Sequence, residues 1–267
     1  MRNKNSAMSA LQAVRLPVAA AALMLSASVA QAQSASLSEA LTGGKVGLDL
    51  RYRYEHVDQD NQQRNANAST LRTRLNYATG AFAGVSAFLE FDDVTVIGSE
   101  RYNNATGLPS AKTQYSVVAD PDGTEVNQAF LSYTGVPGSL LKLGRQRIIY
   151  DNARFIGNVG WRQNEQTYDA FSLVNSSLAD TQLSYAYIDK VNRIFGEDSP
   201  NGETEMQSHL LNLGYSGFDA GKLSLYGYFL EYVDAPAASN RTLGARFAGG
   251  YPLGSDNRLL YTLEYAK

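Results

Sequence analysis

The segment from Lys45 to Val57 reads KVGLDLRYRYEHV and alternates along its whole length between two kinds of side chain. The apolar or aromatic set is Val46, Leu48, Leu50, Tyr52 and Tyr54, and the polar set includes Asp49, Arg51, Arg53 and Glu55. Successive side chains of a β-strand point to opposite faces, whereas a helix repeats about every 3.6 residues. The segment therefore predicts a strand with one apolar face and one charged face.

The same alternation recurs along the chain. Between residues 84 and 94, for example, Val85, Leu89 and Phe91 oppose Glu90 and Asp92. The segment lengths are close to the about 9 to 11 residues that a tilted strand needs to cross a bilayer. We predict eleven strands, at residues 45–57, 69–80, 84–95, 124–134, 139–148, 167–176, 181–190, 206–216, 222–233, 241–251 and 257–267.

The connections between these segments alternate between long and short. Residues 58–68 form a long connection and 81–83 a short one, and residues 96–123 are followed by the short turn at 135–138. Tight periplasmic turns and long extracellular loops give a transmembrane barrel this rhythm, whereas a soluble sandwich has no reason to keep it. The sequence thus predicts an all-β protein, a transmembrane antiparallel β-barrel.

The strand count bears on closure of the barrel. An open sheet edge in lipid leaves unpaired backbone groups that cost several kcal/mol each. Single-chain bacterial barrels have even strand numbers, and eleven is odd. We therefore expect this chain to lack C-terminal strands of a complete barrel with about 18 strands.

The N-terminus predicts secretion. Arg2, Lys4 and Arg15 precede an apolar stretch at residues 16–25, and small residues follow up to a possible cleavage site after Ala32. A membrane anchor would need about 18 or more apolar residues. We expect a signal peptide at residues 1–32, a short periplasmic segment at 33–44 and the barrel at 45–267, placed in the outer membrane of a Gram-negative bacterium.

The composition excludes several kinds of chemistry. The chain has no cysteine, two histidines and a formal net charge of -3, which argue against thiol chemistry, extensive imidazole chemistry and nucleic-acid binding. The pair Ser208 and His209 defines no catalytic triad. Residues 120–125 suggest either a calcium loop or, more simply, a turn. We expect no enzymatic activity, no cofactor and no metal site.

Specific motifs point to a family. Residues 143–170 contain LGRQRIIYDN, RFIGN and WRQNEQTYDA, and shorter motifs are LRYRYE at 50–55, LRTRL at 71–75, FLEFD at 88–92 and EVNQA at 125–129. Over residues 45–267 the chain resembles the outer-membrane alginate export family. The resemblance implies a monomeric barrel of about 18 strands that passes a polyanionic polysaccharide through an arginine-rich constriction.

Four arginines share the polar faces of two consecutive expected strands. We call them the arginine row: Arg51, Arg53, Arg72 and Arg74. Arginines suit an anion pore because their fixed positive charge replaces the lost hydration of a carboxylate, which they can also bind bidentately. Glu90 and Asp92 on the following strand can hold the row in place. Alternatively, the arginine row cross-braces the wall through salt bridges with Glu55, Glu90 and Asp92, and the two interpretations are compatible.

A second group of basic residues surrounds the connection at residues 149–166. It consists of Arg145, Arg147, Arg154 and Arg162. The connection folds either into the lumen as a constricting loop or outward, where its basic residues would bind lipopolysaccharide phosphates. Trp161 within it is either a residue that stacks on a sugar ring or, more commonly for a lone tryptophan, a member of the interfacial aromatic girdle.

The expected function is a passive outer-membrane channel that passes an alginate-like polyuronate by diffusion through an arginine-lined lumen. The alternative is an uptake porin for sugars or small organic acids. The expected partners are an anionic polysaccharide or small anions, outer-membrane lipid and lipopolysaccharide, and periplasmic export machinery, with no nucleic acid.

Overall fold

The computed structural model describes residues 33–254 and 256–267. The expected signal peptide at residues 1–32 lies outside the described residues. Within them, no helix is long and apolar enough to cross a membrane.

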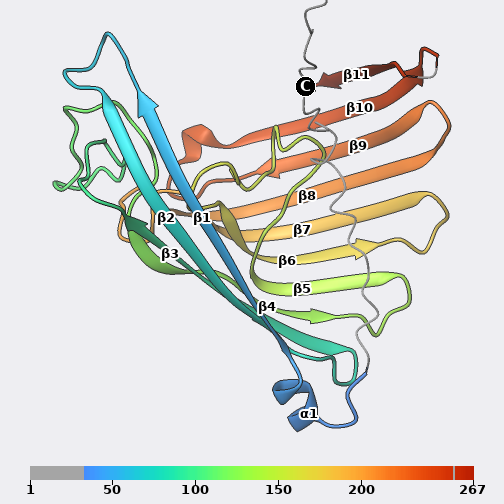
Figure 1. Cartoon of the computed structure of the whole chain (residues 1–267). Coiled ribbons are helices and arrows are strands. Elements are labelled where there is room, and N and C mark those ends of the chain that lie inside the picture. The colour runs from blue at the N-terminus through green and yellow to red at the C-terminus, as the bar shows by residue number, and fades with distance from the viewer. Residues whose placement is uncertain (1–32, 255) are drawn as a thin grey trace, which may run out of the picture. The chain divides into compact units, whose positions relative to one another are not determined.

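Eleven antiparallel strands form one curved sheet in which each strand pairs with its neighbours in the sequence (Figure 1). Their bounds are β1 Lys45–Val57, β2 Ala66–Ala78, β3 Val85–Val96, β4 Gly123–Tyr133, β5 Ser139–Gln146, β6 Thr167–Asn175, β7 Thr181–Asn192, β8 Glu203–Phe218, β9 Gly221–Leu230, β10 Asn240–Pro252 and β11 Arg258–Ala266. All eleven predicted strands are present. Among the described residues, β1 and β11 are the two edges of the sheet.

Two strands start three residues earlier than predicted. β2 begins at Ala66, because the small residues Ala66 and Ala68 are buried under Tyr102 and Val118 of the β3–β4 connection. Because alanine is small, a search of the sequence for bulky apolar side chains does not detect this packing. β8 begins at Glu203 and continues the pairing with β7 through polar residues, which carry no apolar alternation.

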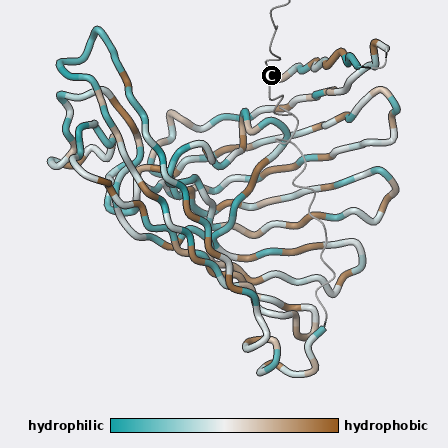
Figure 2. Tube along the Cα trace, viewed as in Figure 1, coloured by the Kyte–Doolittle hydropathy of each residue, from teal (hydrophilic) through white to brown (hydrophobic). Residues whose placement is uncertain are grey.

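The outer face of the sheet is apolar. The side chains Val46, Leu48, Leu50, Tyr52 and Tyr54 of β1 are each at least 60 % exposed. Figure 2 shows hydrophobic positions interspersed with polar ones along the strands. An exposed, continuous apolar face is what a lipid-facing wall requires, since lipid replaces the protein core as the apolar solvent.

The inner face differs between the two parts of the sheet. On β1 to β4 it carries charged residues, whereas on β6 to β9 it carries a buried apolar cluster. We call this the inner apolar cluster, and its strand members include Tyr168, Ala186, Ile188, Leu210, Tyr226 and Tyr228.

In the part of the chain that the structure describes, two short helices accompany the sheet. Helix α1, Leu37–Thr42, is capped by Ser36, whose hydroxyl accepts a hydrogen bond from the Glu39 N–H at 3.1 Å. The Gly80 N–H donates to the Ala40 carbonyl at 2.9 Å, which holds α1 at the β2–β3 turn (Figure 1). The 3-10 helix η1, Pro236–Ala238, lies in the β9–β10 connection.

The connection between β5 and β6, residues 147–166, turns back across the inner face of the sheet. We call it the inward loop. Residues 148–156 contribute Ile148 and Ile156 to the inner apolar cluster, and residues 158–166 contact β1, β2 and β4. The loop therefore links the apolar part of the inner face with the charged part.

Candidate channel constriction

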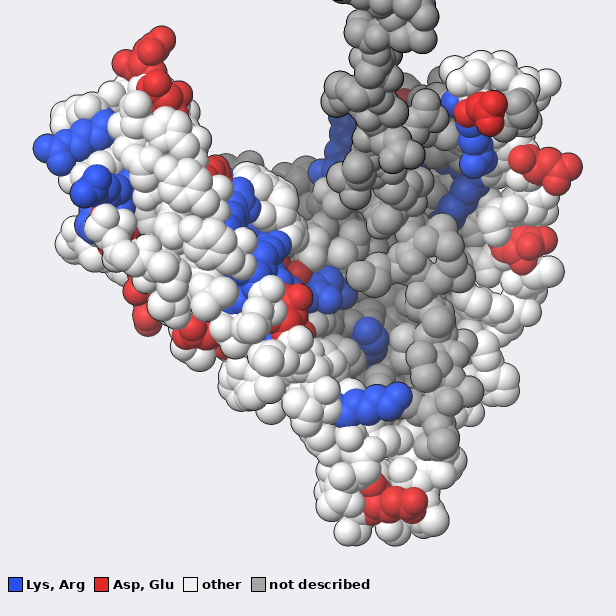
Figure 3. Space-filling view, in the orientation of Figure 1, with Lys and Arg blue, Asp and Glu red and all other residues white. Residues whose placement is uncertain are grey.

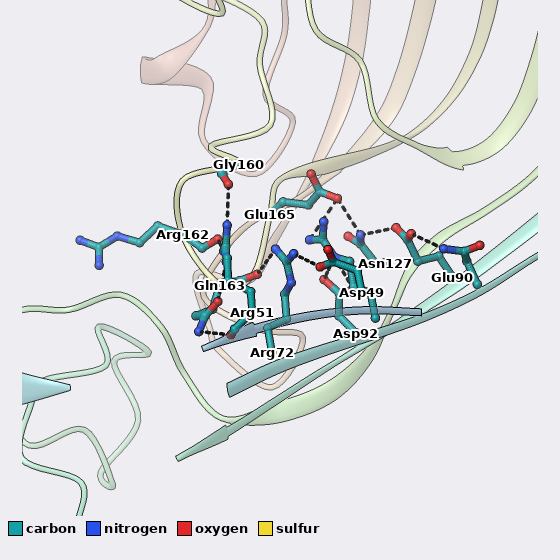
Figure 4. Close-up of polar contacts among 12 residues, drawn as sticks. Asp49, Arg51, Arg72, Glu90, Asp92, Asn127, Gly160, Arg162, Gln163 and Glu165 are labelled. Carbon is teal, nitrogen blue, oxygen red and sulfur yellow. Dashed lines mark hydrogen bonds and ion pairs between the residues drawn. The ribbon is translucent and has the colours of Figure 1, made fainter. Parts of the chain in front are cut away.

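Arg51 holds the backbone of the inward loop against β1. Its Nε donates to Gln163 Oε1 at 2.8 Å, its Nη1 donates to the Gly160 carbonyl at 3.1 Å, and its Nη2 donates to the Arg162 carbonyl (Figure 4). The Gln163 side chain in turn donates to Thr70 Oγ1 at 2.8 Å. One arginine thus satisfies three acceptors of a segment that has no regular secondary structure.

Glu165 anchors the same part of the loop through its carboxylate. It accepts hydrogen bonds from Arg147 Nε at 2.7 Å, Asn127 Nδ2 at 2.7 Å and Asn158 Nδ2 at 2.6 Å, and Arg74 Nη2 lies 3.2 Å from its Oε1. Burial by itself raises the pKa of Glu165, but the hydrogen bond and charge of Arg147, together with the charge of Arg74, outweigh it and lower the pKa below its ordinary value. Glu165 therefore stays ionised inside the loop contact.

The arginine row is largely paired with carboxylates. Arg74 Nε donates to both oxygens of Asp92, at 2.6 and 2.8 Å, and Arg72 Nη2 bonds Asp49. Arg53 bonds Glu55. These contacts match the cross-bracing interpretation for Arg53 and Arg74. Arg72 on β2 instead bonds a carboxylate of the adjacent strand β1.

Glu90 lies in the same region but binds other partners. A register shift between β3 and β4 makes room for Asn127 and Gln128 side by side, and both donate to Glu90 Oε1, at 2.8 and 2.9 Å. Arg147 Nη2 lies 3.6 Å from the same oxygen. Glu90 therefore positions β4 and the start of the inward loop instead of the arginine row.

Taken together these contacts form one charged network. Its members are Arg51, Arg53, Arg72, Arg74, Arg147 and Arg162 with Asp49, Glu55, Glu90, Asp92, Asp120 and Glu165, so six arginines face six carboxylates. Figure 3 shows basic and acidic atoms lying next to one another on the left side of the view. By formal charge the network is balanced.

The members of the network differ in how far their side chains are exposed to solvent. The side chains of Asp92, Asp120 and Glu165 are each 1 % exposed, whereas those of Arg53 and Arg147 are 22 % and 31 % exposed. Several carboxylates thus lie behind guanidinium groups that reach water. Asp49 and Glu55 are exceptions, with 59 % and 21 % of their side chains exposed. Arg72, Arg74 and Arg162 are the less exposed arginines, at 7 %, 11 % and 10 %.

The other half of the inward loop is held by apolar contact. The ring of Tyr150 stacks on Tyr228 with 5.9 Å between centroids, and Phe155 packs 5.6 Å from Tyr226. Asp151 pins the turn, because its carboxylate accepts from Ser224 Oγ at 2.6 Å and Asn212 Nδ2 at 2.9 Å. This half is therefore docked on β8 and β9.

Two predicted site residues lie outside the network. Arg145 pairs with Asp169, its register partner on β6, through Nε at 2.9 Å. Arg154 reaches toward β11, where its Nη1 lies 3.7 Å from Glu264, and 65 % of its side chain is exposed. The structure thus brings together Arg51, Arg53, Arg72, Arg74, Glu90, Asp92, Arg147 and Arg162, but not Arg145 and Arg154.

Trp161 lies on the inner side of the sheet. Its carbonyl accepts a hydrogen bond from Arg53 Nη1, on the polar face of β1, and its ring contacts the guanidinium groups of Arg53 and Arg162. The interfacial girdle interpretation is therefore wrong for this residue. The outward alternative for the connection is wrong for the same reason, because the loop folds toward the sheet.

Asp120 and Gln163 are site residues that sequence reasoning missed. The carboxylate of Asp120 accepts the Gln163 N–H at 2.9 Å, so the β3–β4 connection braces the inward loop from a third direction. This is the turn whose acidic residues suggested a calcium loop. No group of three or more potential metal ligands occurs in the described part of the chain. Asp49, Asn127 and Glu165 were also missed, although Asp49 was already on the predicted polar face.

Comparisons with known proteins agree with this architecture. A family model described as alginate export matches residues 44–267. No curated protein matches the sequence. Among solved structures, the outer-membrane porin OccAB1 of Acinetobacter baumannii matches with a TM-score of 0.65 and 13 % identity, covering 88 % of this chain and 55 % of that one.

Two further porins give similar matches. OccAB3 of the same organism has a TM-score of 0.64 and 15 % identity, covering 85 % of this chain and 58 % of its own. OpdK of Pseudomonas aeruginosa, in a crystal structure with vanillate, has a TM-score of 0.58 and 18 % identity, covering 85 % and 57 %. The chain thus spans a little over half the length of the solved chains it matches, and at these identities the likeness shows the fold.

Proposed function

The chain belongs to the alginate export family and is an outer-membrane channel protein of a Gram-negative bacterium, and from that premise we propose that it passes alginate-like polyuronates by diffusion. The inward loop narrows the lumen, and the arginines of the charged network meet the carboxylates of the permeating chain. No cofactor takes part.

The difference in exposure within the charged network carries this proposal. Carboxylates such as Asp92 and Glu165 are buried, while Arg53 and Arg147 reach water. At Arg53 and Arg147 a permeating anion meets guanidinium donors that reach water, and buried carboxylates beside them fix their orientation. Arginine can bind a carboxylate bidentately, which favours polyuronates over neutral chains.

Ion selectivity in planar bilayers tests the proposal. The protein purified from outer membranes is expected to prefer anions, read as the sign of the reversal potential in a salt gradient. The double variant Arg72→Ala plus Arg74→Ala leaves Asp49 and Asp92 without their partners and is expected to shift the preference toward cations. Arg64→Ala is the control, since Arg64 lies in the β1–β2 connection and contacts Tyr115. Cation selectivity of the wild type, or no shift in the double variant, would overturn the proposal.

A second candidate is uptake of small organic acids. It is favoured by OpdK, a protein of similar fold that was crystallised with vanillate, an aromatic carboxylate. Competition for the open-channel current separates the two functions. A polyuronate channel is blocked by oligouronates at lower concentration than by vanillate, and an uptake porin shows the reverse order.

The N-terminal organisation is part of the proposal. We expect residues 1–32 to be removed on export, leaving residues 33–44 in the periplasm ahead of β1. Mass spectrometry of the protein from outer membranes should find Gln33 as the first residue, and an intact Met1 would contradict this.

A further inference from the structure

We propose that Trp161 and Arg162 form a binding subsite for a carboxylated sugar ring at the surface of the inward loop. The inference rests on the proposed function, because it assigns one ring of the permeating polyuronate to one place in the channel. The indole would stack on the apolar face of the ring, and the guanidinium would bind its carboxylate.

The backbone around Trp161 is fixed before any ligand arrives. The carbonyls of Gly160, Trp161 and Arg162 each accept a hydrogen bond from an arginine of β1, Arg51 or Arg53. Val159 has a φ of 52°, a left-handed conformation that a β-branched residue adopts only under constraint. A stacking platform held in this way loses little conformational entropy when it binds.

The ring of Trp161 contacts two guanidinium groups and still exposes much of its surface to solvent. The guanidinium carbon of Arg162 lies 4.0 Å from the ring centroid, and that of Arg53 lies 5.3 Å from it. Yet 59 % of Trp161 remains exposed. Tryptophan so exposed on an inner surface is unusual for a residue that only packs, because burying its ring would be favourable.

Arg162 keeps two donors that no described residue accepts from, and 10 % of its side chain is exposed to admit a ligand. Its Nη1 donates to Glu55 at 3.2 Å and lies 3.8 Å from Asp120, which orients the guanidinium plane against the indole. Within the described residues its Nε and Nη2 donate no hydrogen bond, whereas Arg53 uses its terminal nitrogens for Trp161 and Glu55. Nε and Nη2 lie on one edge of the planar group, the edge that binds a carboxylate bidentately.

This pairing of groups selects a chemical class. A pyranose ring offers C–H groups to the indole, and a carboxylate on the same ring reaches the adjacent guanidinium. A neutral sugar satisfies the first contact only, and an acyclic carboxylate the second only. A uronic acid residue satisfies both.

Intrinsic fluorescence reports on this site alone, because the chain contains a single tryptophan. The purified protein in detergent is titrated with a trimer of uronic acid residues. The expected result is a saturable change in Trp161 emission. A neutral trisaccharide of the same length and the acyclic tricarboxylate citrate should each need about tenfold higher concentrations for half saturation, since each makes one of the two contacts. Equal responses to trimer and citrate, or to trimer and neutral sugar, would overturn the subsite.

Two variants complete the test. Arg162→Lys keeps the charge beside Glu55 and Asp120 but loses the planar fork, and it should weaken the fluorescence response to the trimer about fivefold. Trp161→Ala should weaken block of the channel current by the trimer about fivefold, while Trp161→Phe retains most of the block.

The outcomes separate the two proposals. If the channel prefers anions but the trimer leaves Trp161 emission unchanged, the subsite is wrong and the proposed function stands. If the channel shows no anion preference, the proposed function fails whatever the fluorescence shows. Unchanged block in Trp161→Ala would also overturn the subsite.

Discussion

The two halves of the inward loop are held to the sheet by different forces. Residues 148–156 bury Ile148 and Ile156 in the inner apolar cluster, and residues 158–166 place Gln163 and Glu165 within the charged network. Apolar burial does not depend on protonation, whereas a carboxylate contact does. The inward loop thus has one end held mainly by apolar burial, to which Asp151 adds one carboxylate contact, and one end held mainly by carboxylate contacts.

Among the substitutions that test this comparison, Glu165→Ala should cause the largest loss of stability. Removing one partner of a buried ion pair costs about 3–5 kcal/mol. Arg147 loses the carboxylate that it hydrogen-bonds, and Arg74 keeps only Asp92. Urea unfolding in detergent measures the loss of stability, and tryptic cleavage after Arg162 reports release of the charged half. Glu203→Ala is the control, since the Glu203 side chain is 52 % exposed. Equal effects of the two variants would contradict an anchor at Glu165.

Ile156→Ala tests the apolar half. Ile156 is 2 % exposed, and truncating such a side chain costs about 3 kcal/mol through lost burial and the cavity left behind. The same unfolding assay measures it, and the loss should be the same at low and high salt. Ile149→Ala, in the same half of the loop at a residue that is 46 % exposed, should cost much less stability. A strong salt dependence for Ile156→Ala would show that the halves are not distinct.

Acidification should release the charged half of the inward loop. The folded pKa of Glu165 lies below its ordinary value of 4.5, so its contribution to stability is fully present above that value and is lost as the pH falls through the lowered folded pKa. Single-channel conductance is therefore expected to stay constant from pH 7 to about 4.5 and to rise below it. In Glu165→Gln this acid step should be absent. A step at neutral pH in the wild type would assign the response to another group.

Asp49→Asn should have the smallest effect. Asp49 bonds Arg72 but is 59 % exposed, so water already solvates it and the pair contributes only about 0.2–1 kcal/mol. Asp92→Asn makes the same change of charge at a buried position and should cost several times more in the unfolding assay. Similar losses of stability in the two variants would show that burial does not determine how much each ion pair contributes.

The strands could be predicted from the sequence because their signal is local. Each alternation, such as that of Lys45 to Val57, fixes the two faces without reference to any other segment. The register also places Arg74 directly opposite both Asp49 and Asp92. Which of the two carboxylates it takes is decided by geometry in three dimensions, and the structure gives it Asp92 and leaves Asp49 to Arg72.

The constriction could be predicted only in part. The basic residues around 149–166 indicated an unusual connection, but the direction in which it folds depends on Gln163 meeting Arg51 and Thr70, which no local pattern encodes. Asp120 is a further example, since a short acidic turn gives no sign that its carboxylate accepts the Gln163 N–H. The extra residue that brings Asn127 beside Gln128 is equally invisible before the strands are paired.

The inward loop has a consequence for the order of folding. Neighbouring strands of this sheet pair across short turns or single loops, but the hydrogen bond from Arg51 to Gln163 joins residues 112 positions apart, and that from Asn212 to Asp151 joins residues 61 apart. Contacts of long sequence separation form slowly because the chain between them must first be ordered. We therefore expect the inward loop to dock after its two supporting walls, so that a newly inserted molecule passes through an open stage before the proposed constriction forms.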